Sequence, residues 1–152
     1  MAGTTPVTIL LEENQTLTGS SICLLRLTSL HLINYLNPNC SSMKLIAWNC
    51  QGARSFAFRN HAHEIYRRHR PQILIIVEPR IAEKQAQVVI DNLPYSHSRR
   101  VDLVGFSGDI WMLWNECSQF RVEILTTSDY SIHALVKVPP FFLNSYLCLT
   151  LF

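Results

Sequence analysis

The chain has 152 residues, of which 48% are hydrophobic and 16% are charged, and its formal net charge is +2. A disordered chain needs low hydrophobicity and high net charge, so that class is excluded. Five Gly and seven Pro residues are too few for a collagen-like or linker-like chain. The length suits one small or medium domain. With so weak an overall field, a nucleic acid would have to be held by a local basic patch.

The charged residues are concentrated in the middle of the chain. Outside residues 43–138 the only charged side chains are Glu12, Glu13 and Arg26. The middle is therefore about as charged as an ordinary globular domain, and the low overall charge comes from the two ends. Residues 1–42 are expected to be an N-terminal extension, poorly structured or with one short helix, and residues 139–152 an apolar tail.

The short helix is expected in residues 22–36, ICLLRLTSLHLINYL, where the apolar positions lie close to helical spacing. The segment is shorter than the roughly 20 apolar residues that a transmembrane helix needs, and Arg26 and His31 interrupt it. No positive residue precedes it as in a signal peptide. The turn-forming residues 37–42 then predict a loop. We therefore expect neither a signal peptide nor a membrane span.

From residue 43 the pattern is typical of an α/β protein. The apolar runs at 44–48 and 72–77 predict strands, the second buried on both faces. Between them, residues 56–70 show helical periodicity, which Pro71 ends. A strand, a helix and a strand in this order predict two parallel strands with a right-handed crossover.

The remaining segments indicate a change to antiparallel strands. Residues 81–92 are rich in good helix formers, and Leu93-Pro94 ends that predicted helix. Short β-forming segments separated by turn residues follow it. They are residues 95–103, 110–114, 120–126 and 132–138. The predicted fold class is mixed α/β, with a βαβ start and antiparallel strands after it.

Two polar residues stand at the predicted strand ends. Asn49 follows the first strand and Glu78 follows the second, and parallel neighbours present such residues at the carboxyl edge, where α/β folds bind ligands. A carboxylate there can hold Mg²⁺, which uses one or two carboxylates and keeps several waters. An amide can donate to a phosphate or orient the carboxylate. The alternative is purely structural: Glu78 begins a turn and Asn49 caps a loop.

Four segments together resemble a known family: MKLIAWNCQGA at 43–53, HRPQILIIVEPRI at 69–81, VGFSGDIWMLWN at 104–115 and SDYSIHALV at 128–136. They are similar to the N-terminal half of the endonuclease/exonuclease/phosphatase superfamily, which has the deoxyribonuclease I-like fold. The likeness is greatest to the endonuclease domain of plant non-LTR (LINE-type) retrotransposons. The resemblance covers residues 43–138.

This resemblance implies the first half of a four-layer α/β sandwich and Mg²⁺-assisted hydrolysis of a phosphodiester, here the nicking of DNA. Asn49 matches the family's asparagine at the catalytic centre, and Glu78 matches the glutamate that ligates the metal. We expect Arg54 and Arg80 to contact the nucleic acid. The family role would place the protein in the nucleus, although no localisation signal is visible, and no specific protein partner is indicated.

The sequence also departs from the family. The Gly-Asp-Phe-Asn and Ser-Asp-His motifs that complete the family's site do not occur, and Ser128-Asp129 belongs to an earlier hairpin. A missing general acid or base typically lowers the rate by about 10²–10⁴-fold. We therefore expect no nuclease activity from these residues alone, and weak or absent Mg²⁺ binding. Gly108-Asp109 replaces the usual Gly-Gly, which predicts a strained turn.

Three functions remain open at this point. The chain is a metal-dependent phosphodiesterase, a non-catalytic fragment derived from a retrotransposon, or a weak nucleic-acid-binding module that uses its arginines. Salt-dependent DNA binding without cleavage would distinguish the third from the second.

Other motifs indicate structure more than function. His61 and His63 are two residues apart and cannot share a metal on one helix. The basic residues 67–70 favour a helix C-terminus, with contact to a phosphate backbone as the alternative. Trp111 and Trp114 would face opposite sides of a strand, which predicts packing. The five cysteines include no C-x-x-C pair, so neither a zinc site nor a disulfide framework is indicated.

Overall fold

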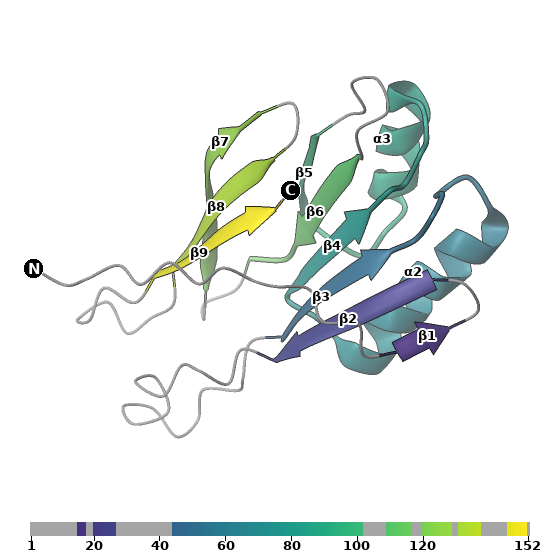
Figure 1. The fold of residues 1–152 in the computed structure, drawn as a ribbon, viewed down its shortest axis with the longest axis horizontal. Helices are drawn as coiled ribbons and strands as arrows, with labels where there is room; N and C mark the ends of the chain where they lie inside the picture. The colour runs from purple at the N-terminus through teal and green to yellow at the C-terminus, as the bar shows by residue number, and fades with distance from the viewer. Residues whose placement is uncertain are drawn as a thin grey trace, which may run out of the picture.

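The computed structural model describes residues 15–17, 20–26, 44–101, 109–116, 120–128, 131–137 and 146–151. These residues form two sheets and two helices, so the predicted mixed α/β class is confirmed (Figure 1). The elements in chain order are β1 (Gln15–Leu17), β2 (Ser20–Arg26), β3 (Lys44–Asn49), α2 (Phe56–His69), β4 (Ile73–Val77), α3 (Glu83–Asp91), β5 (His97–Val101), β6 (Ile110–Trp114), β7 (Arg121–Thr127), β8 (Ile132–Lys137) and β9 (Tyr146–Leu151).

The larger sheet has the strand order β1-β2-β3-β4-β6-β5, and the smaller sheet has the order β7-β8-β9. Strands β3 and β4 are parallel, with Ala47 opposite Ile75, as the βαβ pattern predicts. All the other strand pairs of both sheets are antiparallel. The change from a parallel pair to antiparallel strands after α3 is therefore confirmed.

Helices α2 and α3 cover one face of the larger sheet (Figure 1). The core between the helices and this face of the sheet contains three aromatic rings. Trp48 stacks on Phe58 with centroids 5.0 Å apart, and Phe58 meets Trp111 edge to face at 6.3 Å. All three residues are buried. Because β3, β6 and α2 each contribute one ring, this cluster fixes the helix against the strands that it covers.

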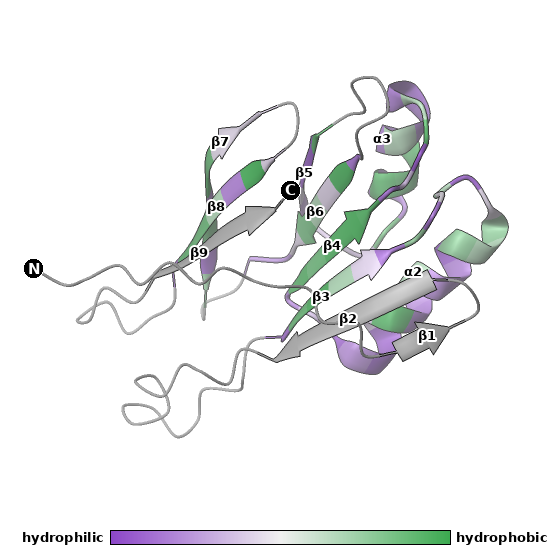
Figure 2. Ribbon diagram, viewed as in Figure 1, coloured by the Kyte–Doolittle hydropathy of each residue, from purple (hydrophilic) through white to green (hydrophobic). Residues whose placement is uncertain are grey.

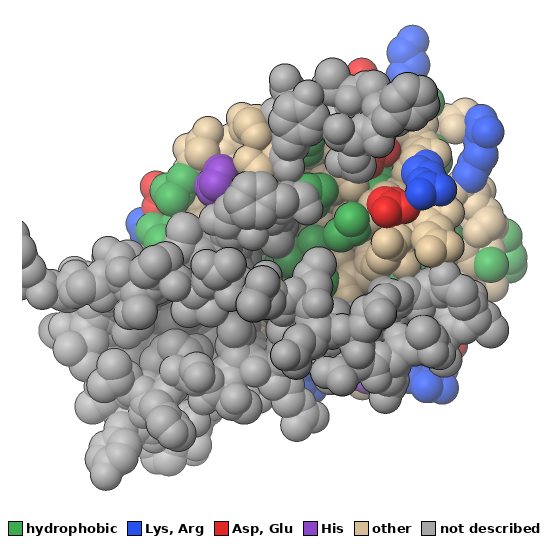
Figure 3. Space-filling view, viewed as in Figure 1, with side chains coloured by type: hydrophobic (Ala, Val, Ile, Leu, Met, Phe, Trp, Pro, Cys, Tyr) green, Lys and Arg blue, Asp and Glu red, His purple; other side chains and the backbone are tan. Residues whose placement is uncertain are grey.

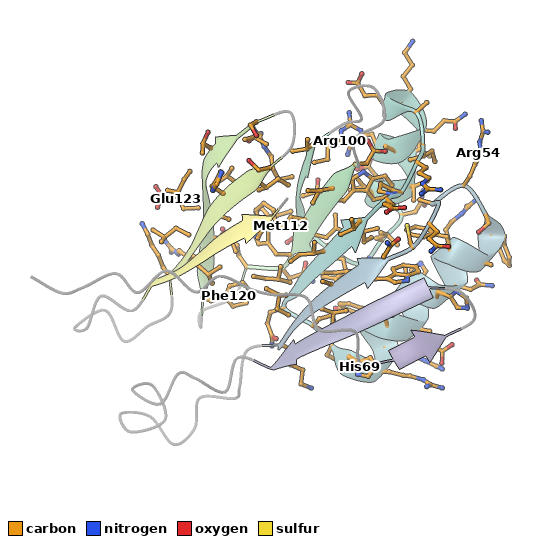
Figure 4. All side chains as sticks on the ribbon, viewed as in Figure 1. Arg54, His69, Arg100, Met112, Phe120 and Glu123 are labelled. Carbon is orange, nitrogen blue, oxygen red and sulfur yellow. The ribbon has the colours of Figure 1, made fainter. Side chains whose placement is uncertain are left out.

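The smaller sheet packs on the other face of the larger sheet. Met112 and Val101 of the larger sheet share a buried core with Ile132 and Val136 of β8 and with Phe120, which lies just before β7. The labelled side chains of Met112 and Phe120 lie between the two sheets in Figure 4. The larger sheet is therefore a middle layer, covered by helices on one side and by a second sheet on the other.

Trp111 and Trp114 belong to these two different cores. The prediction that they face opposite sides of one strand is confirmed, and both are buried packing residues.

The structure differs from the sequence analysis at both ends. Ser20–Arg26 is strand β2, paired antiparallel with β3, so the helix expected from residue 22 is wrong over residues 22–26. Residues 27–36 of that expected helix lie outside the described residues. In the apolar tail, Tyr146–Leu151 forms β9 on β8. A short apolar run does not distinguish helix from strand, and the open edges of β3 and β8 each accept a strand.

Candidate functional site

The carboxyl ends of β3 and β4 form the candidate site. Asn49, the last residue of β3, lies opposite Val77, the last residue of β4. The loops that follow therefore begin side by side at one edge of the sheet. Asn49 Nδ2 donates a hydrogen bond to Glu78 Oε1 over 3.4 Å. The structure brings together the two polar residues that the sequence places at the strand ends.

Backbone hydrogen bonds connect the two loops. Cys50 N donates to the Val77 carbonyl over 3.1 Å, and Ala53 N donates to the Pro79 carbonyl over 2.6 Å. On the other side, Glu78 N donates to the carbonyl of Asp109, just before β6, over 3.0 Å. The backbone around Glu78 is therefore fixed from both neighbouring strands.

This edge also contains most of the unusual backbone angles in the described residues. Among the residues that the structure describes, positive φ occurs at Gln51 (51°), Gly52 (126°), Glu78 (56°) and Arg80 (47°), and otherwise only at Arg70, which caps α2. Residues in such conformations persist where the surrounding structure determines them, and they are frequent at functional sites. Their concentration in these two loops supports a role for the edge beyond connecting strands.

The strain expected at Gly108-Asp109 is not found at Asp109. Its φ is not among the positive values of the described residues, and Gly108 lies outside them. Asp109 is buried, and its backbone carbonyl accepts the Glu78 hydrogen bond. The residue with positive φ at this contact is Glu78, in the loop after β4.

The Glu78 carboxylate has two partners. Arg80 Nη2 lies 2.5 Å from Oε2, and Oε1 accepts the bond from Asn49. The Asn49 amide oxygen accepts from Gln51 N over 3.2 Å, which fixes the amide and directs its NH₂ group at Glu78. The Glu78 side chain is 33% exposed and that of Arg80 is 64% exposed. Acidic and basic side chains lie together on this part of the surface (Figure 3).

Cys50 lies under the Glu78 turn, and its Sγ donates to the Glu78 carbonyl over 3.6 Å. Burial raises the pKa of the Cys50 thiol to about 11. The thiolate is the reactive form of cysteine, and burial disfavours it here, so we interpret the buried Cys50 as a packing residue.

The donor atoms at this edge fit a weakly held hard cation. Within the described part of the chain no group of three or more His, Cys, Asp or Glu side chains could hold a metal. Mg²⁺ does not need such a group, because it commonly binds through one or two carboxylates together with waters and phosphate oxygens. Glu78 supplies one carboxylate, and Arg80 already occupies one of its oxygens.

The two arginines expected to contact nucleic acid differ in their surroundings. Arg80 is held by Glu78, and this pairing was not predicted from the sequence. Arg54 is exposed on the loop before α2 and projects away from the molecule (Figure 4). It makes no hydrogen bond or ion pair with another described residue. Arg54 is therefore available to an external anion at once, whereas Arg80 must first leave Glu78.

The basic run at residues 67–70 does not belong to this edge. His69 lies at the end of α2 that is opposite to Arg54 (Figure 4), and its carbonyl accepts a bond from Lys44, the first residue of β3. Arg67 and Arg68 both pair with Glu64. This arrangement favours the interpretation as a solvated helix end.

Comparison with known proteins gives no match to a family model, to a curated protein or to a solved structure. No helix in the described ranges is long and apolar enough to cross a membrane.

Proposed function

We propose that residues 43–138 form the first half of an endonuclease/exonuclease/phosphatase-type domain, and that the β3–β4 edge is its cation- and phosphate-binding part. The contact of Asn49 with Glu78 across the ends of two parallel strands carries this proposal. The order of layers, helices on the larger sheet and a second sheet behind it, supports the first half of a deoxyribonuclease I-like sandwich.

Each residue at the edge has a physical role in this proposal. Glu78 would hold Mg²⁺ through a carboxylate oxygen. When bound, Mg²⁺ supplies charge neutralisation at the phosphoryl oxygens of a phosphodiester. Asn49 orients Glu78 and offers an N–H to a phosphate oxygen. Arg54 and Arg80 provide positive charge for the nucleic-acid backbone.

The sequence motifs that activate water and protonate the leaving oxygen in this family do not occur in the chain. Within the described residues, Glu78 belongs to no group of three or more His, Cys, Asp or Glu side chains that could hold a metal. General acid–base groups contribute about 10²–10⁴-fold each to the rate. We therefore expect the polypeptide of these 152 residues to bind the cation and the phosphate weakly without turning over a phosphodiester.

A plasmid-nicking assay in Mg²⁺ tests the expected inactivity. The wild-type chain should nick supercoiled DNA no faster than Glu78→Ala or the buffer does. Glu116→Gln is the matched control, because Glu116 is exposed and makes no ion pair with another described residue. Robust nicking that Glu78→Ala abolishes and Glu116→Gln preserves would overturn the claim of inactivity.

Cation binding tests the role of Glu78 separately. Mn²⁺ prefers the same oxygen ligands as Mg²⁺, and its electron paramagnetic resonance signal falls on binding. Glu78→Gln should remove the strongest Mn²⁺ site, and Glu116→Gln should retain it. Equal binding by wild type and Glu78→Gln would refute the proposed function.

The alternative of a weak nucleic-acid-binding module has one observation in its favour, the exposed guanidinium of Arg54. In that case DNA binding needs no divalent cation and weakens steeply with salt. Arg54→Gln should then reduce the slope of log K against log salt concentration by the amount expected for about one phosphate contact. Glu78→Gln should leave DNA binding unchanged. An inert retrotransposon-derived fragment would bind neither cation nor DNA.

A further inference from the structure

The turn that follows β4 is built around an internal ion pair. Glu78 and Arg80 both have positive φ, and the carbonyl of the buried Pro79 between them accepts a hydrogen bond from Ala53. A residue before proline normally adopts an extended backbone with negative φ, so the Glu78 conformation is imposed by its surroundings. The turn holds opposite charges of residues i and i+2 at 2.5 Å.

Arg80 occupies the same carboxylate that the proposed cation needs. One Glu78 oxygen faces the guanidinium at 2.5 Å, and the other accepts the longer bond from Asn49 at 3.4 Å. A guanidinium and a divalent cation repel each other at this range. Binding of the cation to Glu78 must therefore weaken or break the contact with Arg80.

We propose that Arg80 is an exchangeable counter-ion of Glu78: it pairs with the carboxylate while no cation is bound, and it turns to a phosphate when a divalent cation takes its place. This inference rests on the proposed function of Glu78 as a cation ligand. The Arg80 side chain is 64% exposed, so it has room to leave Glu78. Its planar fork of donors matches a phosphate group.

The exchange couples two binding events at one edge. While Arg80 pairs with Glu78 the two charges cancel, and the edge attracts a phosphate weakly. With a divalent cation on Glu78 and Arg80 released, the same edge has a net positive charge. Cation and phosphodiester should therefore strengthen each other's binding, as linkage requires.

Mn²⁺ titrations of the full chain test the competition. Exposed ion pairs are weak, so Arg80→Gln should bind Mn²⁺ about two- to fivefold more tightly than wild type. Arg80→Lys retains the positive charge but loses the planar guanidinium, so its Mn²⁺ affinity should lie between those of wild type and Arg80→Gln. Arg121→Gln on β7 is the control for net charge, because Arg121 is exposed and lies on the other sheet. It should behave as wild type.

A fluorescent single-stranded oligonucleotide tests the coupling. In anisotropy titrations, Mn²⁺ should strengthen its binding to wild type by a larger factor than its binding to Arg80→Gln. An equal factor in both proteins would overturn the claim that Arg80 turns to the phosphate. Circular dichroism of every variant checks that the fold is retained, and Arg80→Lys keeps the test valid if Arg80→Gln does not fold.

The Mn²⁺ titrations distinguish a failure of the Arg80 counter-ion proposal from a failure of the proposed cation site at Glu78. If Glu78→Gln loses Mn²⁺ binding and Arg80→Gln equals wild type, the counter-ion proposal is wrong and the role of Glu78 stands. If Glu78→Gln binds Mn²⁺ as well as wild type does, both are wrong. If only Arg80→Gln binds measurably, and the additional change Glu78→Gln removes that binding, the competition is supported in its strongest form.

Discussion

The two sheets of this protein are buried in different ways. Every residue of β6 in the larger sheet is buried, whereas β8 in the smaller sheet alternates between buried and half-buried positions. The hydropathy colouring shows the same contrast, with green central strands in the larger sheet and mixed colours on β7 and β8 (Figure 2). Strands β3, β4 and β6 of the larger sheet contribute side chains to cores on both faces, whereas only one face of β8 lies in the core between the sheets.

The candidate site lies at the ends of β3 and β4, two strands that are packed on both faces. Strands packed on both faces resist displacement, because neighbouring layers hold them on each side. The loops that leave such strands can be kept in strained conformations by a few hydrogen bonds. The smaller sheet shares a core with these strands on the face opposite to the helices.

The largest expected loss of stability follows from removing an aromatic ring between the helices and the larger sheet. Phe58→Ala removes the ring that contacts Trp48 and Trp111, and such changes lower the free energy of unfolding by about 3–5 kcal/mol. Phe56→Ala on the same helix removes a ring that is 72% exposed and should change it by less than about 0.5 kcal/mol. Urea unfolding measures both. Similar losses in the two variants would contradict the packing of α2.

Truncation of a side chain in the core between the two sheets should have the next largest effect on the free energy of unfolding. Ile132→Ala removes a fully buried side chain from the inner face of β8, which typically lowers the free energy of unfolding by about 2–4 kcal/mol. Leu135→Ala, at a half-buried position on the other face, should have a clearly smaller effect. If the order is reversed in thermal or urea unfolding, the smaller sheet does not pack as described.

The pH dependence of stability reports on burial at the edge itself. Burial raises the pKa of Cys50 from 9.0 to about 11, so the folded state retains a proton that the unfolded state loses first. The free energy of unfolding therefore keeps its full value below pH 9 and falls by about 2–3 kcal/mol as the pH rises toward 11. Tyr95, whose pKa is also raised by burial, acts in the same direction at higher pH. Cys50→Ala should flatten the decline of Tm between pH 9 and 11; an unchanged slope would contradict the burial.

The smallest expected effects distinguish the two helices that cover the larger sheet. Ser55 caps α2 by accepting from Phe58 N over 3.1 Å, whereas Ala82 at the start of α3 has an extended backbone and no capping side chain. Ser55→Ala should lower stability by about 1 kcal/mol. Ala82→Ser should raise it by a few tenths to about 1 kcal/mol. Opposite signs in thermal unfolding would confirm the comparison.

The contrast between the sheets also determines how much could be predicted. The continuous apolar runs of β4 and β6 and the alternation in β8 are visible in the sequence, and the expected strands at 72–77, 110–114 and 132–138 are found within one residue at each end. The helix expected at 56–70 begins and ends within one residue of α2. These elements follow from local periodicity, so one sequence is enough.

The errors occur where pairing partners decide the structure. Strand β2 was expected to be helical, and β9 lies in a segment for which only an apolar tail was expected. Strand β2 pairs with the edge of β3, and β9 pairs with the edge of β8. Neither pairing can be recognised from the residues within the segment itself. Tertiary pairing then overrides local spacing.

The candidate site shows the same limit. The proximity of Asn49 and Glu78 could be predicted, because parallel strand order alone brings strand ends together. The pair of Glu78 and Arg80 could not, because it depends on two positive φ angles around a proline that local rules do not favour. The exposure of Arg54 likewise depends on how the loop before α2 is placed.

The most direct test of the account is the position of a bound cation, observed residue by residue. In ¹H–¹⁵N correlation spectra, substoichiometric Mn²⁺ should first broaden the amide signals of residues 49–52, Val77, Glu78 and Arg80; Pro79 has no amide proton. Signals around Glu64 on α2 and Glu123 on β7 should remain sharp at the same concentration. Broadening that is equal at all exposed carboxylates, or that spares the edge, would contradict a cation site at Glu78.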